Sequence, residues 1–282
     1  MIRLFLREIR IEHTLFALPF AYVGAIVAAD GLPRPRTLFW ITLAVLGART
    51  AAMAANRYFD RKIDARNPRT AKRATASGRL SPQVMVGATV AGLVLLVGAA
   101  WQLNPLCVKL LPLAALGLVL YPLCKRFTSL GHFVLGAVDG LAPLGAYIGV
   151  AGKVGLPGVL LFLAVTVWVA GFDILYALMD LDVDRAQNLR SIPARFGQRT
   201  SQMLALALHA VMVVALVLAG AMARATLPYY AGILLAVALL IYEQRLLQVA
   251  KNFFVLNERI FISNMAFSVA FLATTLAGFT LR

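Results

Sequence analysis

Hydrophobic residues in this sequence gather into nine long segments separated by shorter polar stretches. A helix needs about 20 predominantly apolar residues to cross the hydrocarbon core of a bilayer, and each segment is close to this length. The pattern therefore predicts an all-α, polytopic membrane protein with about nine transmembrane helices in a single domain. The segments lie at 14–29, 37–57, 84–103, 106–122, 130–151, 156–177, 203–222, 227–247 and 260–281 of the 1–282 chain.

The composition agrees with membrane embedding. Hydrophobic residues make up 61% of the chain and charged residues 14%, and the mean hydropathy is +0.82, far more apolar than an average soluble domain. The net charge of +15 raises the possibility of a nucleic-acid partner. The basic residues, however, fall between the apolar segments and form no recognition module. We therefore expect the lipid bilayer, and no nucleic acid, as a partner.

Basic residues are distributed unequally between alternate connecting segments. The N-terminal tail and the segments around 58–82, 123–129, 178–202 and 245–259 contain 20 of the 27 Lys and Arg residues, when Arg57 is counted with the second segment. Connecting segments that are rich in Lys and Arg stay on the cytoplasmic side of a membrane. The sequence therefore predicts a protein of the cell inner membrane whose N-terminus and long basic loops face the cytoplasm.

The first acidic motif follows the second apolar segment. Asn56, Asp60 and Asp64 are spaced by four residues. On a helix these steps drift by only about 40° over two turns, so the three oxygen-bearing side chains share one stripe.

The second acidic motif follows the sixth apolar segment. Steps of three, four and four residues join Asp173, Tyr176, Asp180 and Asp184, so a continuous helix would carry all four on one face. Asp182 would point elsewhere on the same helix.

The two motifs together predict a magnesium site. Carboxylate and amide oxygens are hard ligands that suit Mg²⁺, which keeps room for waters and substrate phosphates. A diphosphate is the natural bridging ligand, because carboxylates alone would repel it, whereas bound Mg²⁺ would neutralise the charge on a departing diphosphate. The predicted metal ligands are Asn56, Asp60, Asp64, Asp180 and Asp184.

Cationic residues accompany both acidic motifs and suit phosphate oxygens. For any one of them, an ordinary solvated charge remains an alternative. They are Arg69, Lys72 and Arg73 after the first motif, Lys125 and Arg126 between the motifs, and Arg190, Arg195 and Arg199 after the second.

Arg49 lies in the middle of an apolar segment, seven residues before Asn56 and so on nearly the same helical face. An intramembrane arginine is a functional candidate by default. Our hypothesis is that it binds an anionic group, such as the carboxylate of an aromatic acceptor. The alternative is a structural ion pair with Asp139 or Asp173.

The two motifs, the YPLCKRF segment at 121–127 and the SIPARFG segment at 191–197 occur in an order that resembles the UbiA superfamily of intramembrane prenyltransferases. The resemblance implies nine helices around a central cavity, two acidic cytoplasmic loops above it, and a laterally open path for a lipid tail. Segments 11–25 and 48–70 are similar to enzymes of quinone biosynthesis. One departure is Arg57, where many relatives have Asp.

Within the superfamily, two aromatic acceptors remain as alternatives. The chain resembles both the 4-hydroxybenzoate polyprenyltransferases and the menaquinone enzymes of the futalosine route, whose acceptor would be a dihydroxynaphthoate, and the sequence of 48–70 favours the second. The other substrate, the prenyl donor, would be a polyprenyl diphosphate, and Mg²⁺ would be the cofactor. A secondary transporter of an anionic metabolite and a membrane scaffold are the rival classes, but motifs placed at the membrane face rather than at the midplane argue against a transporter.

The resemblance and the motifs together assign roles to individual residues. Lys125 would assist diphosphate departure, and the rings of Tyr121 and Tyr176 would stabilise an allylic cation. The predicted catalytic residues are Asp60, Asp64, Asp180, Asp184 and Lys125. The predicted substrate-binding residues are Arg49, Asn56, Arg69, Lys72, Arg73, Tyr121, Arg126, Asp173 and Tyr176.

Overall fold

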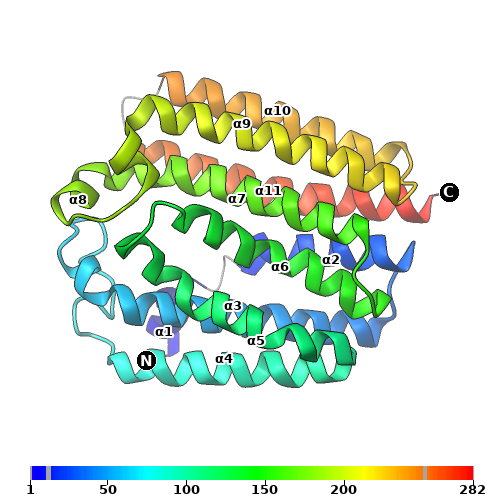
Figure 1. Cartoon of the computed structure of the whole chain (residues 1–282), viewed down its shortest axis with the longest axis horizontal. Coiled ribbons are helices and arrows are strands. Elements are labelled where there is room, and N and C mark those ends of the chain that lie inside the picture. Colours follow the sequence, from blue (N-terminus) through cyan, green and yellow to red (C-terminus); the bar gives the residue numbers. More distant parts are fainter. Residues whose placement is uncertain (1, 11–13, 250–252, 282) are drawn as a thin grey trace.

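A computed structural model of the protein describes residues 2–10, 14–249 and 253–281, and every regular element in these ranges is helical (Figure 1). Residues 11–13 of the segment 11–25 lie outside the described residues. The elements are α1 (Ile2–Glu8), α2 (Thr14–Ala29), α3 (Pro35–Ala65), α4 (Pro82–Leu103), α5 (Pro105–Leu120), η2 (Tyr121–Arg126), α6 (Gly131–Ala151), α7 (Leu156–Ala177), η3 (Leu178–Asp180), α8 (Leu181–Ala186), α9 (Ile192–Met222), α10 (Leu227–Val249) and α11 (Phe253–Thr280).

Each of the nine predicted apolar segments forms one long helix, from α2 to α7 and from α9 to α11. Eight of the described helices are long and apolar enough to cross a membrane, and α2 contributes a shorter apolar stretch, Ala17–Ala29. The long helices run side by side along one axis (Figure 1). The all-α, polytopic fold class predicted from the hydropathy pattern is confirmed.

Two helices are longer than the apolar segments that predicted them. α3 continues beyond residue 57 to Ala65, so the segment predicted as a loop from 58 begins with two further helical turns. α9 begins at Ile192, about three turns before the apolar run at 203–222. Ser191 caps this helix by accepting a hydrogen bond from the Ala194 N–H, and Gly197 interrupts it with a φ of 80°. Both helices therefore extend beyond their apolar segments by polar turns, α3 at its C-terminal end and α9 at its N-terminal end.

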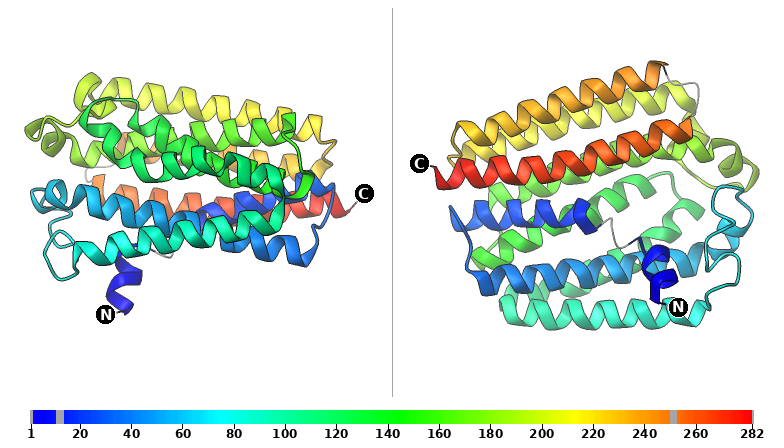
Figure 2. Two further views of the ribbon diagram at one scale, coloured as in Figure 1. Left: turned by 60° about the horizontal axis from the view of Figure 1, so that its bottom comes forward. Right: turned by 180° about the vertical axis from the view of Figure 1, so that it is seen from behind.

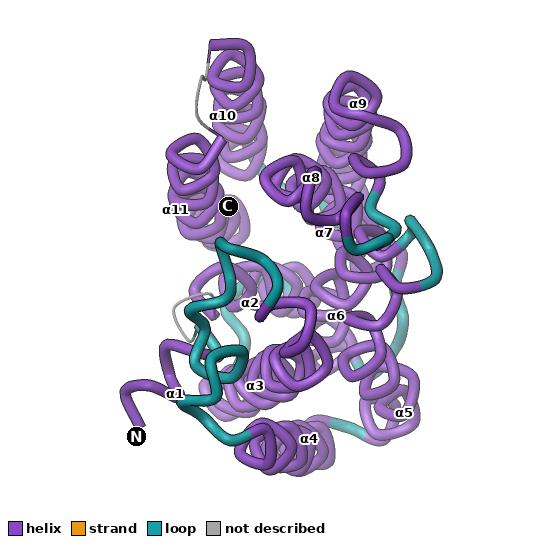
Figure 3. Tube along the Cα trace, turned by 90° about the vertical axis from the view of Figure 1, so that its left-hand side faces the viewer, coloured by secondary structure: helices purple, strands orange, loops and turns teal. Residues whose placement is uncertain are grey.

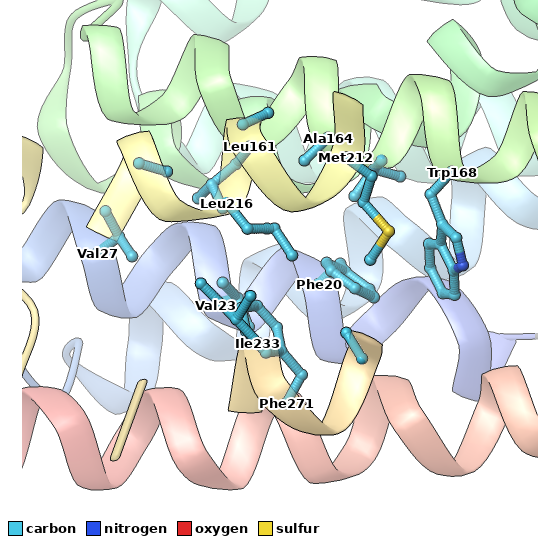
Figure 4. Close-up of a cluster of buried hydrophobic side chains, with 14 of the residues drawn as sticks. Phe20, Val23, Val27, Leu161, Ala164, Trp168, Met212, Leu216, Ile233 and Phe271 are labelled. Atoms are coloured by element: carbon cyan, nitrogen blue, oxygen red, sulfur yellow. The ribbon is translucent and has the colours of Figure 1, made fainter. Parts of the chain in front are cut away.

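Helix α2 lies in the middle of the bundle, where it contacts α3, α6, α7 and α11 (Figure 3). One side of α2 packs into a large aromatic and aliphatic cluster that includes Phe20, Trp168, Met212 and Phe271 (Figure 4). The Phe20 and Trp168 ring centroids are 5.0 Å apart. The other side packs through small side chains such as Ala21 against α3 and α6. α2 thus joins the two halves of the bundle.

Helix α2 also makes a very close approach to α6. A Cβ atom added at Gly24 would lie 2.1 Å from the carbonyl oxygen of Pro143. Small residues at such crossings let backbones pack closely, which is a main source of helix association in lipid. Only glycine fits at this position.

The polar connecting segments gather at one end of the bundle (Figures 1 and 2). The segment between α3 and α4, the short helix η2 and the segment with η3 and α8 all lie at this end, which we call the motif end because it carries both acidic motifs. Figure 3 looks onto it. The C-terminal end of α11 lies at the opposite end of the bundle.

We expect Gly24→Ala to lower the free energy of unfolding by about 1–3 kcal/mol, because its methyl group must push α2 away from α6. Thermal denaturation of the purified protein in detergent would measure this loss. Gly87→Ala is the matched control, since a Cβ atom at Gly87 meets nothing within 4 Å. Equal stability of the two variants would contradict the close approach.

Candidate active site

The two acidic motifs meet at the motif end through the segment that follows α3. The side-chain amide of Asn67 donates a hydrogen bond of 2.8 Å to Asp180 Oδ1, and Arg69 Nε donates one of 2.9 Å to the same oxygen. A second hydrogen bond joins Arg69 Nη2 to Asp180 Oδ2. Residues more than 110 positions apart in the sequence are thus brought into direct contact.

The second motif does not lie on one continuous α-helix. Asp173 and Tyr176 lie on α7, but Asp180 ends the 3₁₀ turn η3 and Asp184 lies on the separate helix α8. The 3₁₀ turn interrupts the α-helical spacing, so the expected positions hold only as far as Ala177. Tyr176 and Asp180 nevertheless face the same group, because the Arg69 guanidinium contacts both of them.

Asp60 is the most deeply buried acid of the first motif, with 2% of its surface exposed. Lys125 Nζ lies 2.6 Å from its Oδ2, and the Asn56 amide donates to the same oxygen at 3.1 Å. Arg126 Nη2 lies 3.8 Å from Oδ1 and donates a hydrogen bond to the Phe59 carbonyl oxygen. Asp60 Oδ1 itself is buried and accepts no hydrogen bond from the described residues.

The other acids are paired in the same way. Arg73 Nη1 lies 2.8 Å from Asp64 Oδ2, while Arg69 makes its two hydrogen bonds to Asp180 and places its guanidinium 5.4 Å from the Tyr176 ring centroid. Burial opposes the charge of Arg69, but its hydrogen bonds to Asp180 raise its pKa above the ordinary value. Three carboxylates of the two motifs are therefore each matched to a permanent cation.

Two oxygens at the motif end have capacity for a divalent cation, although the acids do not form a ready-made metal site among the described residues. Within the described part of the chain, no three His, Cys, Asp or Glu side chains are close enough together to hold a metal ion, because the acids face Lys and Arg. Asp60 Oδ1, however, is a buried oxygen that accepts no hydrogen bond from the described residues, and a hard cation would satisfy it. Asn56 Oδ1 accepts a hydrogen bond of 2.8 Å from Arg57 Nη1 and keeps one lone pair for a metal.

A largely apolar cavity of about 260 Å³ lies among α3, α4, α5 and α6, and its lining on α3 ends at Ala52, one helical turn before Asn56. Most of its lining is aliphatic, and its polar side chains include Arg49, Tyr121 and Asp139. Arg49 Nη1 lies 3.3 Å from Asp139 Oδ1, so of the two ion-pair partners considered for Arg49 it meets Asp139 and not Asp173. The cavity therefore combines an apolar wall with one ion pair.

Of the remaining predicted residues, Lys72 stands apart from the acids. Lys72 is exposed, and its backbone carbonyl oxygen accepts a hydrogen bond from Arg79. Tyr121 is placed in the cavity lining, whereas Tyr176 lies under Arg69. The structure thus divides the predicted set between the motif end and the cavity.

Asp173 has a partner that sequence reasoning missed. His132 Nδ1 lies 2.6 Å from Asp173 Oδ2, and the Ile192 N–H donates to His132 Nε2 at 3.2 Å. Because Nε2 accepts a hydrogen bond, Nδ1 carries the proton and donates a hydrogen bond to Asp173 Oδ2. A single histidine with no spacing pattern gave no sign of this role, because it depends on the meeting of α6, α7 and the start of α9.

The N-terminal helix α1 fastens the segment that carries Arg69 and Arg73. The carboxylate of Glu8 accepts hydrogen bonds from the backbone N–H groups of Ala74, at 2.8 Å, and Thr75, at 3.0 Å. The Glu8 carbonyl oxygen accepts one of 3.0 Å from Arg57 Nε. Glu8 is buried, and the sequence marked only Arg57, as a departure from relatives.

Comparison with known proteins gives a consistent result. The model of the UbiA prenyltransferase family matches residues 17–279. A 4-hydroxybenzoate octaprenyltransferase from Tolumonas auensis is 36% identical over 225 residues, which cover 79% of this chain and 77% of the relative. One from Pectobacterium carotovorum is 34% identical over 219 residues, covering 77% and 76%.

Solved structures share the fold. The apo structure of a UbiA homolog from Aeropyrum pernix K1 has a TM-score of 0.83 and 31% identity, covering 96% of this chain and 98% of its own. A UbiA homolog from Archaeoglobus fulgidus bound to GPP and Mg²⁺ has a TM-score of 0.72 over 96% of this chain and 99% of its own. At 17% identity, the second likeness is one of fold.

We expect Glu8→Ala to loosen the segment after α3, because two buried N–H groups lose their acceptor. Hydrogen exchange at the amides of Ala74 and Thr75 should become faster, and the free energy of unfolding should fall by about 1–3 kcal/mol. Arg7→Ala, on the exposed side of the same helix, is the control. Unchanged exchange at both amides would show that α1 does not fasten this segment.

Proposed function

Because the chain belongs to the UbiA prenyltransferase family, we propose that it transfers a polyprenyl group from its diphosphate to a hydroxylated aromatic carboxylic acid in quinone biosynthesis. It is an integral membrane enzyme of the prenyltransferase class. The observation that carries the finer proposal is that the short helix η2 connects the two parts of the site. Its Lys125 pairs with Asp60, and its Tyr121 lines an apolar cavity that also contains the half-buried Arg49.

The motif end suits a diphosphate together with Mg²⁺. The residues that would hold Mg²⁺ are Asn56, Asp60, Asp64, Asp180 and Asp184, and the ion would supply neutralisation of the charge on the departing diphosphate. If these acids bound the metal ion, the basic side chains that now pair with them would be free to bind phosphate oxygens. Those cations are Arg69, Arg73 and Lys125.

The cavity suits the reacting end of the prenyl chain and the aromatic ring. Its aliphatic lining excludes water, which would otherwise capture an allylic cation. Tyr121 lies in this lining, so it is better placed than Tyr176 to stabilise that cation, because the Arg69 guanidinium already covers a face of Tyr176. A role for Tyr176 in holding Arg69 against Asp180 fits the contacts better.

Arg49 is the residue that we assign to the carboxylate of the acceptor. Its guanidinium lines the cavity and has five N–H donors, of which the 3.3 Å contact to Asp139 uses one. The C–O bond to the diphosphate breaks, the diphosphate leaves with the bonding electrons, and the acceptor ring attacks the allylic cation that remains. A ring proton is lost to a motif carboxylate or to the released diphosphate, which restores aromaticity.

Two acceptors suit this site, since 4-hydroxybenzoate and a dihydroxynaphthoate both carry a carboxylate for Arg49. The names of the relatives at 36% and 34% identity favour 4-hydroxybenzoate. The sequence of 48–70 favours the dihydroxynaphthoate.

The excess of Lys and Arg at the motif end supports a cytoplasmic position for the motif end.

Product formation identifies the acceptor when the purified protein in lipid is incubated with labelled polyprenyl diphosphate and either 4-hydroxybenzoate or 1,4-dihydroxy-6-naphthoate. We expect one acceptor to give a prenylated product with Mg²⁺ and none with a chelator, because the acids need a metal to accept a diphosphate. Product from the benzoate would place the enzyme in ubiquinone synthesis, and product from the naphthoate alone in menaquinone synthesis. Failure of both would remove the quinone assignment.

We expect Arg49→Gln to raise the acceptor KM about 10- to 100-fold, since a hydrogen bond to a charged group contributes about 1.5–3 kcal/mol. The KM for polyprenyl diphosphate should change little, because Arg49 lies in the cavity rather than at the motif end. Lys109→Gln, at an exposed position on α5, is the control. An unchanged acceptor KM would refute the assignment of Arg49.

A further inference from the structure

A second pocket lies at the motif end, and none of its lining residues belongs to the acidic motifs or to the lining of the apolar cavity. It has a volume of about 620 Å³ and opens between the connection from η2 to α6 and the segment that joins α8 to α9. Its lining includes Ser129, Arg185, Arg190 and Arg195. We call it the arginine pocket.

The arginine pocket is positively charged without compensation. Three arginines and no acidic residue line it, and none of the three forms an ion pair with a carboxylate among the described residues. At the acidic motifs the opposite holds, because Arg69, Arg73 and Lys125 each face an aspartate. The arginine pocket therefore lacks the internal anions that neutralise the neighbouring site.

Each guanidinium of the pocket is held by one contact. Arg190 Nη1 donates to the Phe127 carbonyl oxygen at 2.7 Å, and Arg185 Nε donates to the Ala194 carbonyl oxygen at 3.3 Å. Arg195 makes no such hydrogen bond within the described residues, and its guanidinium lies 5.2 Å from the Phe196 ring centroid. A guanidinium has five N–H donors, so most donors stay available to a ligand.

A buried hydroxyl gives independent support for a ligand. Ser129 is 7% exposed, and its Oγ is buried without any hydrogen-bond partner among the described residues. Buried hydroxyl groups in folded proteins are nearly always hydrogen-bonded, and Ser129 lines the arginine pocket. Because this Oγ has no partner, turning the hydroxyl toward an anionic oxygen in the pocket would cost no existing hydrogen bond.

We propose that the arginine pocket binds a phosphate group, and that this group belongs to an anionic phospholipid. Arginine pairs with phosphate through parallel hydrogen bonds, which accounts for three guanidinium groups around one pocket. Three large apolar residues close in sequence to Ser129 and Arg195 are exposed: Phe127 has 60% of its surface exposed, Leu130 59% and Phe196 52%. Such side chains suit acyl chains beside a basic headgroup site at the membrane surface.

The test is lipid binding by the whole protein, measured by native mass spectrometry after titration with phosphatidylglycerol or phosphatidylcholine. Parallel titrations with inorganic phosphate and with inorganic diphosphate distinguish a lipid from a soluble source. Arg195→Gln is the main variant, since this side chain holds no other described element in place. We expect it to weaken phosphatidylglycerol binding about tenfold, with Ser129→Ala weakening it less.

Arg199→Gln is the matched control, because Arg199 is exposed, lies four residues from Arg195 and does not line the pocket. Thermal denaturation should be unchanged in Arg195→Gln, which shows that a loss of binding is not a loss of fold. Loss of diphosphate binding alone would support the pocket and assign it to a soluble anion. Equal phosphatidylglycerol and diphosphate binding by Arg195→Gln and Arg199→Gln would overturn the proposal.

Discussion

Pairing of buried charges at the motif end is the interaction on which the rest of this structure depends. An unpaired carboxylate at the edge of a hydrocarbon region is costly, so Asp60, Asp64 and Asp180 each lie against a Lys or Arg from another segment. Lys125 belongs to η2, and Arg69 belongs to the segment after α3. The ion pairs that neutralise the acids therefore also fix these polar segments over the end of the bundle.

The same pairing explains how one site can accept a ligand that carries both signs of charge. A metal diphosphate brings a cation for the acids and an anion for the bases, so both halves of each ion pair find a new partner. In the proposed reaction the apolar cavity would keep water from the reactive carbon, and an acceptor carboxylate would enter the ion pair of Arg49 with Asp139.

Two charged features of the motif end do not consist of a carboxylate paired with a Lys or Arg side chain. On one side, Glu8 closes the segment that carries Arg69 and Arg73 by satisfying two of its backbone N–H groups. On another, Arg185, Arg190 and Arg195 face a pocket without acids. Neutral pairs thus surround the proposed reaction, while the arginine pocket keeps uncompensated positive charge, which suits the phospholipid that we propose there.

The sequence by itself determined the nine long helices and the stripe of Asn56, Asp60 and Asp64, because hydropathy and four-residue spacing act locally along one helix. It also singled out most of the cations that meet the acids. Only the tertiary structure decided which cation meets which acid, where the second motif leaves α7, and that Arg49 faces Asp139 rather than Asp173. It alone revealed Glu8 and His132. These contacts join segments far apart in the chain, so their geometry depends on how whole helices pack and not on any local pattern.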